Sequence, residues 1–139
     1  MWKAFNEMQA MGFIGDERPR LVSVQAEGCA PVVKAFHAGV DRTEPWPAPH
    51  TAAYGLRVPS PIGGFLCLRA LRETNGTAIA IPEAEIAKGT ADLARRTGID
   101  ICPEGGAAWV AVQRLRASGF LAPGARVVLF NTGTGLKYR

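Results

Sequence analysis

The chain has 139 residues, of which 47% are hydrophobic and 20% charged, and its formal net charge is +4. This length suits one domain, and the composition is that of a globular protein rather than a disordered one. No apolar run approaches the roughly 18 residues that span a bilayer, and the first residues lack the apolar core of a signal peptide. We therefore expect a cytoplasmic protein with no membrane partner.

Cysteine and histidine are too few and too scattered to suggest a metal site. Cys29, Cys67 and Cys102 are an odd number and form no Cys-x-x-Cys pair, which argues against a disulfide framework and against zinc. We expect three reduced thiols, mostly buried, and no metal. His37 and His50 stand near no partner motif for a catalytic triad or a metal.

The basic residues form no long run and some alternate with acids, so we interpret them as solvated surface and expect no nucleic-acid partner. They include Arg18, Arg20, Arg95, Arg96, Arg114, Arg116, Lys137 and Arg139.

The first half of the chain predicts a helix, a strand, a helix and a long connection. Apolar residues at three-residue intervals indicate an amphipathic helix over 2–11, without a side-chain cap before it. Residues 20–25 are typical of a buried strand, and 30–36 predict a helix with proline in its first turn. The Pro-rich connection 40–61 is long enough to suggest a functional or partner-covering role.

The second half predicts helices and strands in alternation. A helix is expected over 62–72 and a strand over 77–81, and a Pro-Glu pair then opens a helix that ends near Gly98. A second Pro-Glu pair opens a helix that runs to about residue 117, and 126–130 is typical of an apolar strand. The face expected to pack in the first of these helices comprises Ile62, Phe65, Leu66, Arg69 and Ala70.

Apolar strands that alternate with helices predict an α/β fold with a parallel sheet covered on both faces. Three strands make a small open sheet with two unpaired edges and little core. Together with the uncapped first helix, this suggests part of a larger α/β protein.

Ligands of open α/β sheets lie at the carboxyl ends of strands, and three such ends are marked here. They are residues 25–29, the junction of Ile81 with Pro82, and residues 130–135. The last offers glycines that allow close backbone approach and two threonine hydroxyls. The spacing of Gly133 and Gly135 is not a dinucleotide fingerprint, because no helix opens after it, and on spacing alone a plain terminal turn is the better explanation.

Several segments, in order and over nearly the whole chain, resemble the C-terminal portion of threonine synthase. The ending at 127–137, VVLFNTGTGLK, is similar to that family's C-terminal signature, and 1–8, MWKAFNEM, is similar to the helix after its phosphate loop. The other matching segments are VQAEGCAPVV at 24–33, GLRVP at 55–59, FLCLRALRE at 65–73 and CPEGGAA at 102–108.

This resemblance implies a pyridoxal-phosphate (PLP) enzyme of fold type II, related to the tryptophan synthase β chain, that converts O-phospho-L-homoserine and water to L-threonine and phosphate. It aligns Thr132 with the hydroxyl that hydrogen-bonds the pyridine nitrogen of the cofactor. Glu104 is placed near the cofactor pocket, although an acid in a first helical turn is also ordinary helix-start chemistry. Glu27 is interpreted as structural, and Lys137 matches an ordinary position rather than the Schiff-base lysine.

The resemblance also implies that residues 1–139 are the C-terminal portion of the fold type II domain, part of an open, mainly parallel three-layer αβα sheet. The Schiff-base lysine and the phosphate loop of the family precede the position that matches Met1, so no catalytic residue is expected here. The chain alone is then expected neither to hold PLP nor to act on a phosphorylated amino acid. Its partner would be the missing N-terminal half or a second copy.

Two other interpretations stay open on the sequence. One is a non-catalytic remnant or accessory chain that pairs with a partner. The other is a fragment of a related PLP lyase, such as a threonine dehydratase-like or cysteate synthase-like enzyme.

Overall fold

A computed structural model describes residues 1–138 of the chain. Its longest helices have 15 residues, and no helix in the described part is long and apolar enough to cross a membrane. The elements in chain order are α1 (Trp2–Ala10), β1 (Val22–Ala26), α2 (Pro31–His37), the 3-10 turn η1 (Tyr54–Leu56), α3 (Gly64–Glu73), β2 (Thr77–Ile81), α4 (Glu83–Thr97), α5 (Pro103–Ala117) and the 3-10 turn η2 (Gly135–Tyr138).

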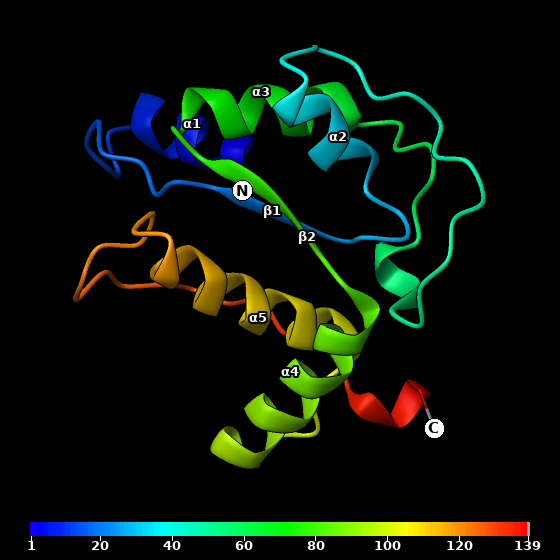
Figure 1. Cartoon of the computed structure of the whole chain (residues 1–139). Coiled ribbons are helices and arrows are strands. Elements are labelled where there is room, and N and C mark those ends of the chain that lie inside the picture. Colours follow the sequence, from blue (N-terminus) through cyan, green and yellow to red (C-terminus); the bar gives the residue numbers. More distant parts are fainter. Residues whose placement is uncertain (139) are drawn as a thin grey trace.

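The two strands form a parallel pair at the centre of the molecule. Val22 lies opposite Thr77 at one end of the pair, and Ala26 lies opposite Ile81 at the other. Helices α2 and α3 cover one face of the pair, while α5 covers the other and α4 packs on α5 (Figure 1). The layered α/β arrangement with a parallel sheet, expected from the sequence, is therefore confirmed.

Each face of the sheet has its own apolar cluster. Ala78 packs toward α2 and α3 with Leu68 and Leu71, whereas Ile81 packs toward α4 and α5 with Val110. Neighbouring positions of a strand point to opposite faces, so a strand buried on both sides must be apolar throughout. This explains why β2 is apolar at every position after Thr77.

Helices α4 and α5 approach each other through glycine. A Cβ atom on Gly106 of α5 would lie 2.0 Å from Thr90 Oγ1, 2.7 Å from Thr90 N and 2.9 Å from Ile86 O of α4. On the facing helix, a Cβ atom on Gly89 would lie 2.5 Å from Val110 Cγ2. The two helices therefore pack at a spacing that only glycine allows.

The strand expected at 126–130 does not form, and this prediction was wrong. The segment is irregular and no neighbouring strand pairs with it within residues 1–138, and Val127, Val128 and Phe130 are 45%, 80% and 54% exposed. A strand exists only where a neighbour satisfies its backbone groups, and apolar content does not supply that neighbour.

The packing face expected for the helix at 62–72 was wrong except at Ala70, which is buried. Helix α3 begins at Gly64, and Ile62 precedes it with 97% of its surface exposed. Phe65 and Leu66 remain about half exposed, while the side of the helix that carries Leu68 faces α2 and the sheet. The helix has two adjoining apolar stripes, and the sheet selects the one that the sequence pattern did not indicate.

The cysteines carry free thiols. Cys29 and Cys102 are buried, as most of the thiols were expected to be, whereas Cys67 on α3 is exposed.

Candidate functional site

The ends of both strands face a cluster of turns and helix starts at one end of the molecule. Figure 1 shows η1, the starts of α4 and α5, and the red C-terminal turn η2 gathered where β2 ends. The first two of the three predicted strand ends adjoin, because the Glu27 N–H donates to Ile81 O at 2.9 Å. The side chain of Glu27 itself is exposed.

The C-terminal signature packs against the residues that lead into α5. Asn131 Oδ1 accepts hydrogen bonds from Cys102 N at 3.3 Å and from the Cys102 thiol at 3.2 Å. The Gly135 N–H donates to Asp100 O at 3.1 Å, and Thr134 forms an isolated β-bridge with Ile101. Hydrogen bonds thus hold residues 131–135 at both ends of the segment.

The two signature glycines differ in the space around them. A Cβ atom on Gly135 would lie 2.5 Å from Asp100 Oδ1 and 3.0 Å from Ile101 O, so this position requires the close approach that glycine permits. A Cβ atom on Gly133 would meet nothing nearer than Cys102, at 3.7 Å. The Gly135 position therefore has a packing explanation that needs no ligand.

Thr132 lies between the hydrogen-bonded residues Asn131 and Gly135, and its side chain is exposed. Its hydroxyl has no hydrogen-bond partner within residues 1–138, whereas the hydroxyl of nearby Thr134 accepts from Leu136 N at 3.3 Å. A neutral hydroxyl that is free to donate has the chemistry that an unprotonated ring nitrogen of a cofactor requires. Thr132 therefore fits that group in character and accessibility.

Glu104 lies in the first turn of α5 and joins two distant segments. Its Oε1 atom accepts the Gly55 N–H at 2.8 Å, from η1, and the Tyr138 hydroxyl at 2.5 Å, from η2. A Cβ atom on Gly55 would lie 2.8 Å from the same oxygen, so a larger residue here would have to displace the carboxylate. The Oε1 atom is thus committed to protein donors.

These contacts shift the acid–base properties of both partners. The hydrogen bond to Glu104 is the main cause that raises the pKa of Tyr138 from 10.0 to about 12. Partial burial raises the pKa of Glu104, but hydrogen bonds from Tyr138 and from backbone N–H groups outweigh it, and the pKa lies below its ordinary value. At neutral pH the carboxylate is charged and the phenol protonated, as the hydrogen bond requires.

The aromatic rings of η1 and η2 reinforce this junction. Tyr54 and Tyr138 stack with centroids 5.8 Å apart and an interplanar angle of 16°. The Arg57 guanidinium lies 5.0 Å from the centroid of the Tyr54 ring, a cation–π contact that adds to the stack.

Glu83, in the first turn of α4, also holds the connection 40–61, as Glu104 does from α5. It accepts the Thr51 hydroxyl at 2.8 Å and the Ala52 N–H at 2.7 Å, both from the connection 40–61. The repeated Pro-Glu opening is visible in the sequence but this role is not, since helix-start chemistry already accounts for the acids. The repeat itself was the available signal.

The two histidines bond to backbone carbonyl groups. His37 Nε2 lies 3.0 Å from Ala78 O and His50 Nδ1 lies 3.3 Å from Ala48 O, positions in which a ring N–H donates.

The lysines all lie at the surface. Lys3 pairs with Glu7, Lys34 pairs with a glutamate of the connection 40–61, and Lys88 and Lys137 are exposed as well.

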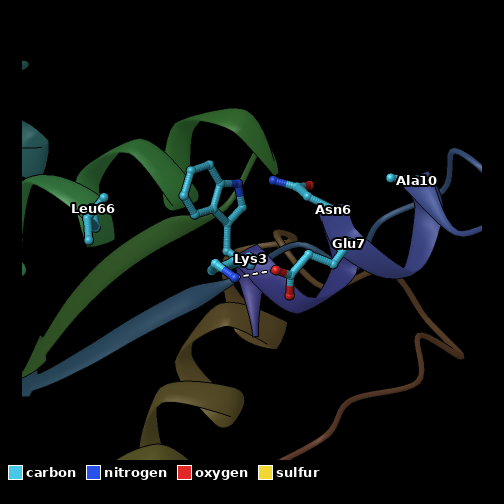
Figure 2. Close-up of a pocket in the computed structure, with 6 residues that line it drawn as sticks. Lys3, Asn6, Glu7, Ala10 and Leu66 are labelled. Carbon is cyan, nitrogen blue, oxygen red and sulfur yellow. Dashed lines mark hydrogen bonds and ion pairs between the residues drawn. The ribbon is translucent and has the colours of Figure 1, made fainter.

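An open groove between α1 and α3 lies away from these residues. Figure 2 shows Lys3, Asn6, Glu7 and Ala10 of α1 beside Leu66 of α3, with the ion pair between Lys3 and Glu7. Beyond that pair its lining offers the Asn6 amide and the indole of Trp2, whose N–H already donates to a glutamate of α3. We therefore place the candidate site at the strand ends.

Comparison with known proteins agrees with the resemblance seen in the sequence. The family described as pyridoxal-phosphate dependent enzyme matches residues 1–133. The threonine synthase of Methanosarcina acetivorans is 34% identical over 99% of this chain and 34% of its own length, and that of Methanocaldococcus jannaschii is 32% identical over 99% and 34%. The chain therefore spans about a third of the length of the curated relatives it matches.

Solved structures of the same fold lie further away in sequence. A threonine deaminase from T.th. superposes with a TM-score of 0.57 and 23% identity, over 69% of this chain and 34% of its own. Maize serine racemase gives a TM-score of 0.57 and 18% identity, over 70% and 30%.

These likenesses support the fold, and the match to the family over most of the sequence decides membership: the chain belongs to the pyridoxal-phosphate-dependent enzymes of fold type II, among which it is similar to threonine synthases.

Proposed function

We propose that residues 1–139 form the C-terminal part of a threonine synthase-like enzyme and supply Thr132 to the pyridine nitrogen of PLP. The observation that carries this proposal is the exposed, unpartnered Thr132 hydroxyl, within residues 1–138, in a signature segment fastened on both sides. Nearly all of the chain matches only a third of each threonine synthase, which supports the assignment to a portion of an enzyme.

The proposed contact suits side-chain replacement chemistry. When bound, PLP supplies the electron sink for reactions at the α and β carbons of an amino acid. A neutral hydroxyl that donates to the ring nitrogen leaves that nitrogen uncharged, so the sink is weaker than with an aspartate partner. The contribution of Thr132 is then to hold the ring and limit its charge, and Glu104 helps to shape the wall of the pocket.

Catalysis on this proposal needs the rest of the enzyme. The exposed lysines have no surroundings that would suit the cofactor-carrying lysine, so that residue would come from the remaining two-thirds. The apolar segment 126–130 and the open edges of the two-stranded sheet offer surfaces for that remainder to cover. The substrate of the complete enzyme would be O-phospho-L-homoserine, and the chain alone would be inactive.

A chimera tests this proposal. Residues 1–139 replace the matching C-terminal third of the Methanosarcina acetivorans threonine synthase, and PLP binding and phosphate release from O-phospho-L-homoserine are measured. We expect both, and we expect Thr132→Val to weaken PLP binding about 5- to 10-fold, as the loss of one neutral hydrogen bond predicts. The matched control Thr134→Val removes a hydroxyl two residues away that bonds only to the backbone.

Three results would contradict the proposal. A chimera with the circular dichroism of the parent enzyme that binds no PLP would favour an accessory chain without catalysis. Equal PLP affinity in Thr132→Val and the unmodified chimera would remove Thr132 from the site. Turnover of threonine or serine, with no phosphate release from O-phospho-L-homoserine, would instead indicate a related lyase.

A further inference from the structure

The start of α5 holds both ends of the C-terminal segment that carries Thr132. Asn131, immediately before it, accepts hydrogen bonds from Cys102, and Gly135 after it donates to Asp100. Tyr138 then donates to Glu104, in the first turn of the same helix. Thr132 is thus placed by contacts on either side rather than by any contact of its own side chain within residues 1–138.

Glu104 also reaches the connection 40–61. The oxygen that accepts the Tyr138 hydroxyl accepts the Gly55 N–H as well, at 2.8 Å. The neighbouring rings of Tyr54 and Tyr138 stack, so η1 and η2 meet along both a polar and an aromatic contact. Moving the carboxylate would disturb both turns together.

We propose that Glu104 is a positioning residue: its hydrogen bonds with Tyr138 of η2 and Gly55 of η1, here called the lock, hold the two turns together and thereby fix where the Thr132 hydroxyl lies. Only the effect of the lock on cofactor binding rests on the proposed function, because the lock itself lies within this chain. Glu104 therefore acts through Tyr138 and Gly55, which both donate to its Oε1 atom.

The charge state of the lock supports this role. The charged carboxylate of Glu104 accepts a hydrogen bond from the Tyr138 hydroxyl and thereby raises the pKa of Tyr138 to about 12. A charge-assisted hydrogen bond of this kind is about twice as strong as one between neutral groups. The contact therefore persists over the whole neutral range of pH.

Amide hydrogen exchange on the 139-residue chain tests the lock without a cofactor. In Glu104→Ala we expect residues 135–138 and the Gly55 amide to exchange about tenfold faster, the factor that loss of a charge-assisted hydrogen bond predicts. Glu104→Gln keeps an acceptor oxygen and should recover part of the protection. Tyr138→Phe should release residues 135–138 while the Gly55 amide stays protected.

Glu83→Ala is the matched control, because Glu83 also follows a proline in the first turn of a helix and holds the same connection. It should speed exchange at Ala52 and Ala53 and leave residues 135–138 unchanged. A second readout is the ultraviolet titration of the two tyrosines: the upper transition, at about 12, should move toward 10 in Glu104→Ala and stay in Glu83→Ala.

The results separate the lock from the proposed function. Unchanged exchange at residues 135–138 in Glu104→Ala, or an unshifted titration, overturns the lock even if the chimera binds PLP. With the lock established, Glu104→Ala in the chimera should weaken PLP binding at least as much as Tyr138→Phe. PLP affinity that both substitutions leave unchanged would refute the link to Thr132, and a chimera that never binds PLP refutes the proposed function but not the lock.

Discussion

The glycine contact between α4 and α5 provides a quantitative test of the packing. We consider Gly106→Ala, which adds one methyl group at the point where the helices are closest. The new Cβ atom would lie 2.0 Å from Thr90 Oγ1, 2.7 Å from Thr90 N and 2.9 Å from Ile86 O. Two of these three atoms belong to the backbone, so no side-chain rotation can relieve them.

The expected magnitude is a balance of two effects. Alanine in a helix interior is favoured over glycine by about 1 kcal/mol. Overpacking typically costs about 1–3 kcal/mol, and the backbone contacts put this site at the upper end. The net expectation for Gly106→Ala is a loss of about 2 kcal/mol in the free energy of unfolding.

Urea denaturation followed by circular dichroism measures this loss. The control is Gly63→Ala, because a Cβ atom on Gly63 meets no atom within 4 Å and its φ is −89°. We expect the control to change the free energy of unfolding by less than about 0.5 kcal/mol. The double variant Thr90→Ala/Gly106→Ala should recover only part of the loss, because the backbone atoms of α4 remain.

A Gly106→Ala variant as stable as the unmodified chain would refute the reasoning, since helix propensity would then have outweighed the contact. Full recovery in the double variant would show that the Thr90 hydroxyl, and not the backbone, sets the helix spacing.

Two further predictions use the same urea assay. Gln25→Met should lower the free energy of unfolding by about 2 kcal/mol or more, because the buried Gln25 Oε1 accepts the N–H groups of Val32 and Val33 at 2.9 and 3.0 Å. Gln25→Glu keeps an acceptor oxygen and should lose less stability, so equal losses in the two variants would contradict this explanation. The pKa of Tyr138 is raised on folding, so its stabilisation is present below pH 10 and is lost as pH rises toward about 12. Stability should fall more steeply over this range than in Tyr138→Phe, and parallel curves would refute the contribution.

The sequence predicted the elements whose signals are local. Strand β2 stands where its apolar run lies, and helix α4 begins after Pro82 and ends at Gly98, which has a φ of +71°. Proline at a helix start and glycine at its end act within a few residues, so they can be read without knowledge of the fold.

The predictions that were wrong concern features that depend on distant neighbours in the fold, which no local sequence pattern encodes. Residues 126–130 have strand composition, but nothing within residues 1–138 pairs with them. The apolar stripes of α3 are similar in sequence, and only the position of the sheet decides between them.

The candidate site was predicted unevenly. The roles expected for Thr132 and Glu104 were inferred from the resemblance to a family. The periodicity of the chain by itself indicated neither the contacts of Glu104 nor those around Thr132. Gly55 meets Glu104 across 49 residues, and Tyr138 meets it across 34. Separations of that length leave no signal in composition or spacing, so the contacts of Tyr138 and Gly55 with Glu104 were missed.

The anchoring of the connection 40–61 by Glu83 and Glu104 has a consequence for the growing chain on the ribosome. Gly55 is made 49 residues before the carboxylate that holds it, an interval of about 2–10 s at roughly 5–20 residues per second. During that time η1 has neither Glu104 nor the stacking ring of Tyr138. The η1 end of the connection therefore stays open to a protease or chaperone for longer than the end at Thr51, which Glu83 can hold after only 32 further residues.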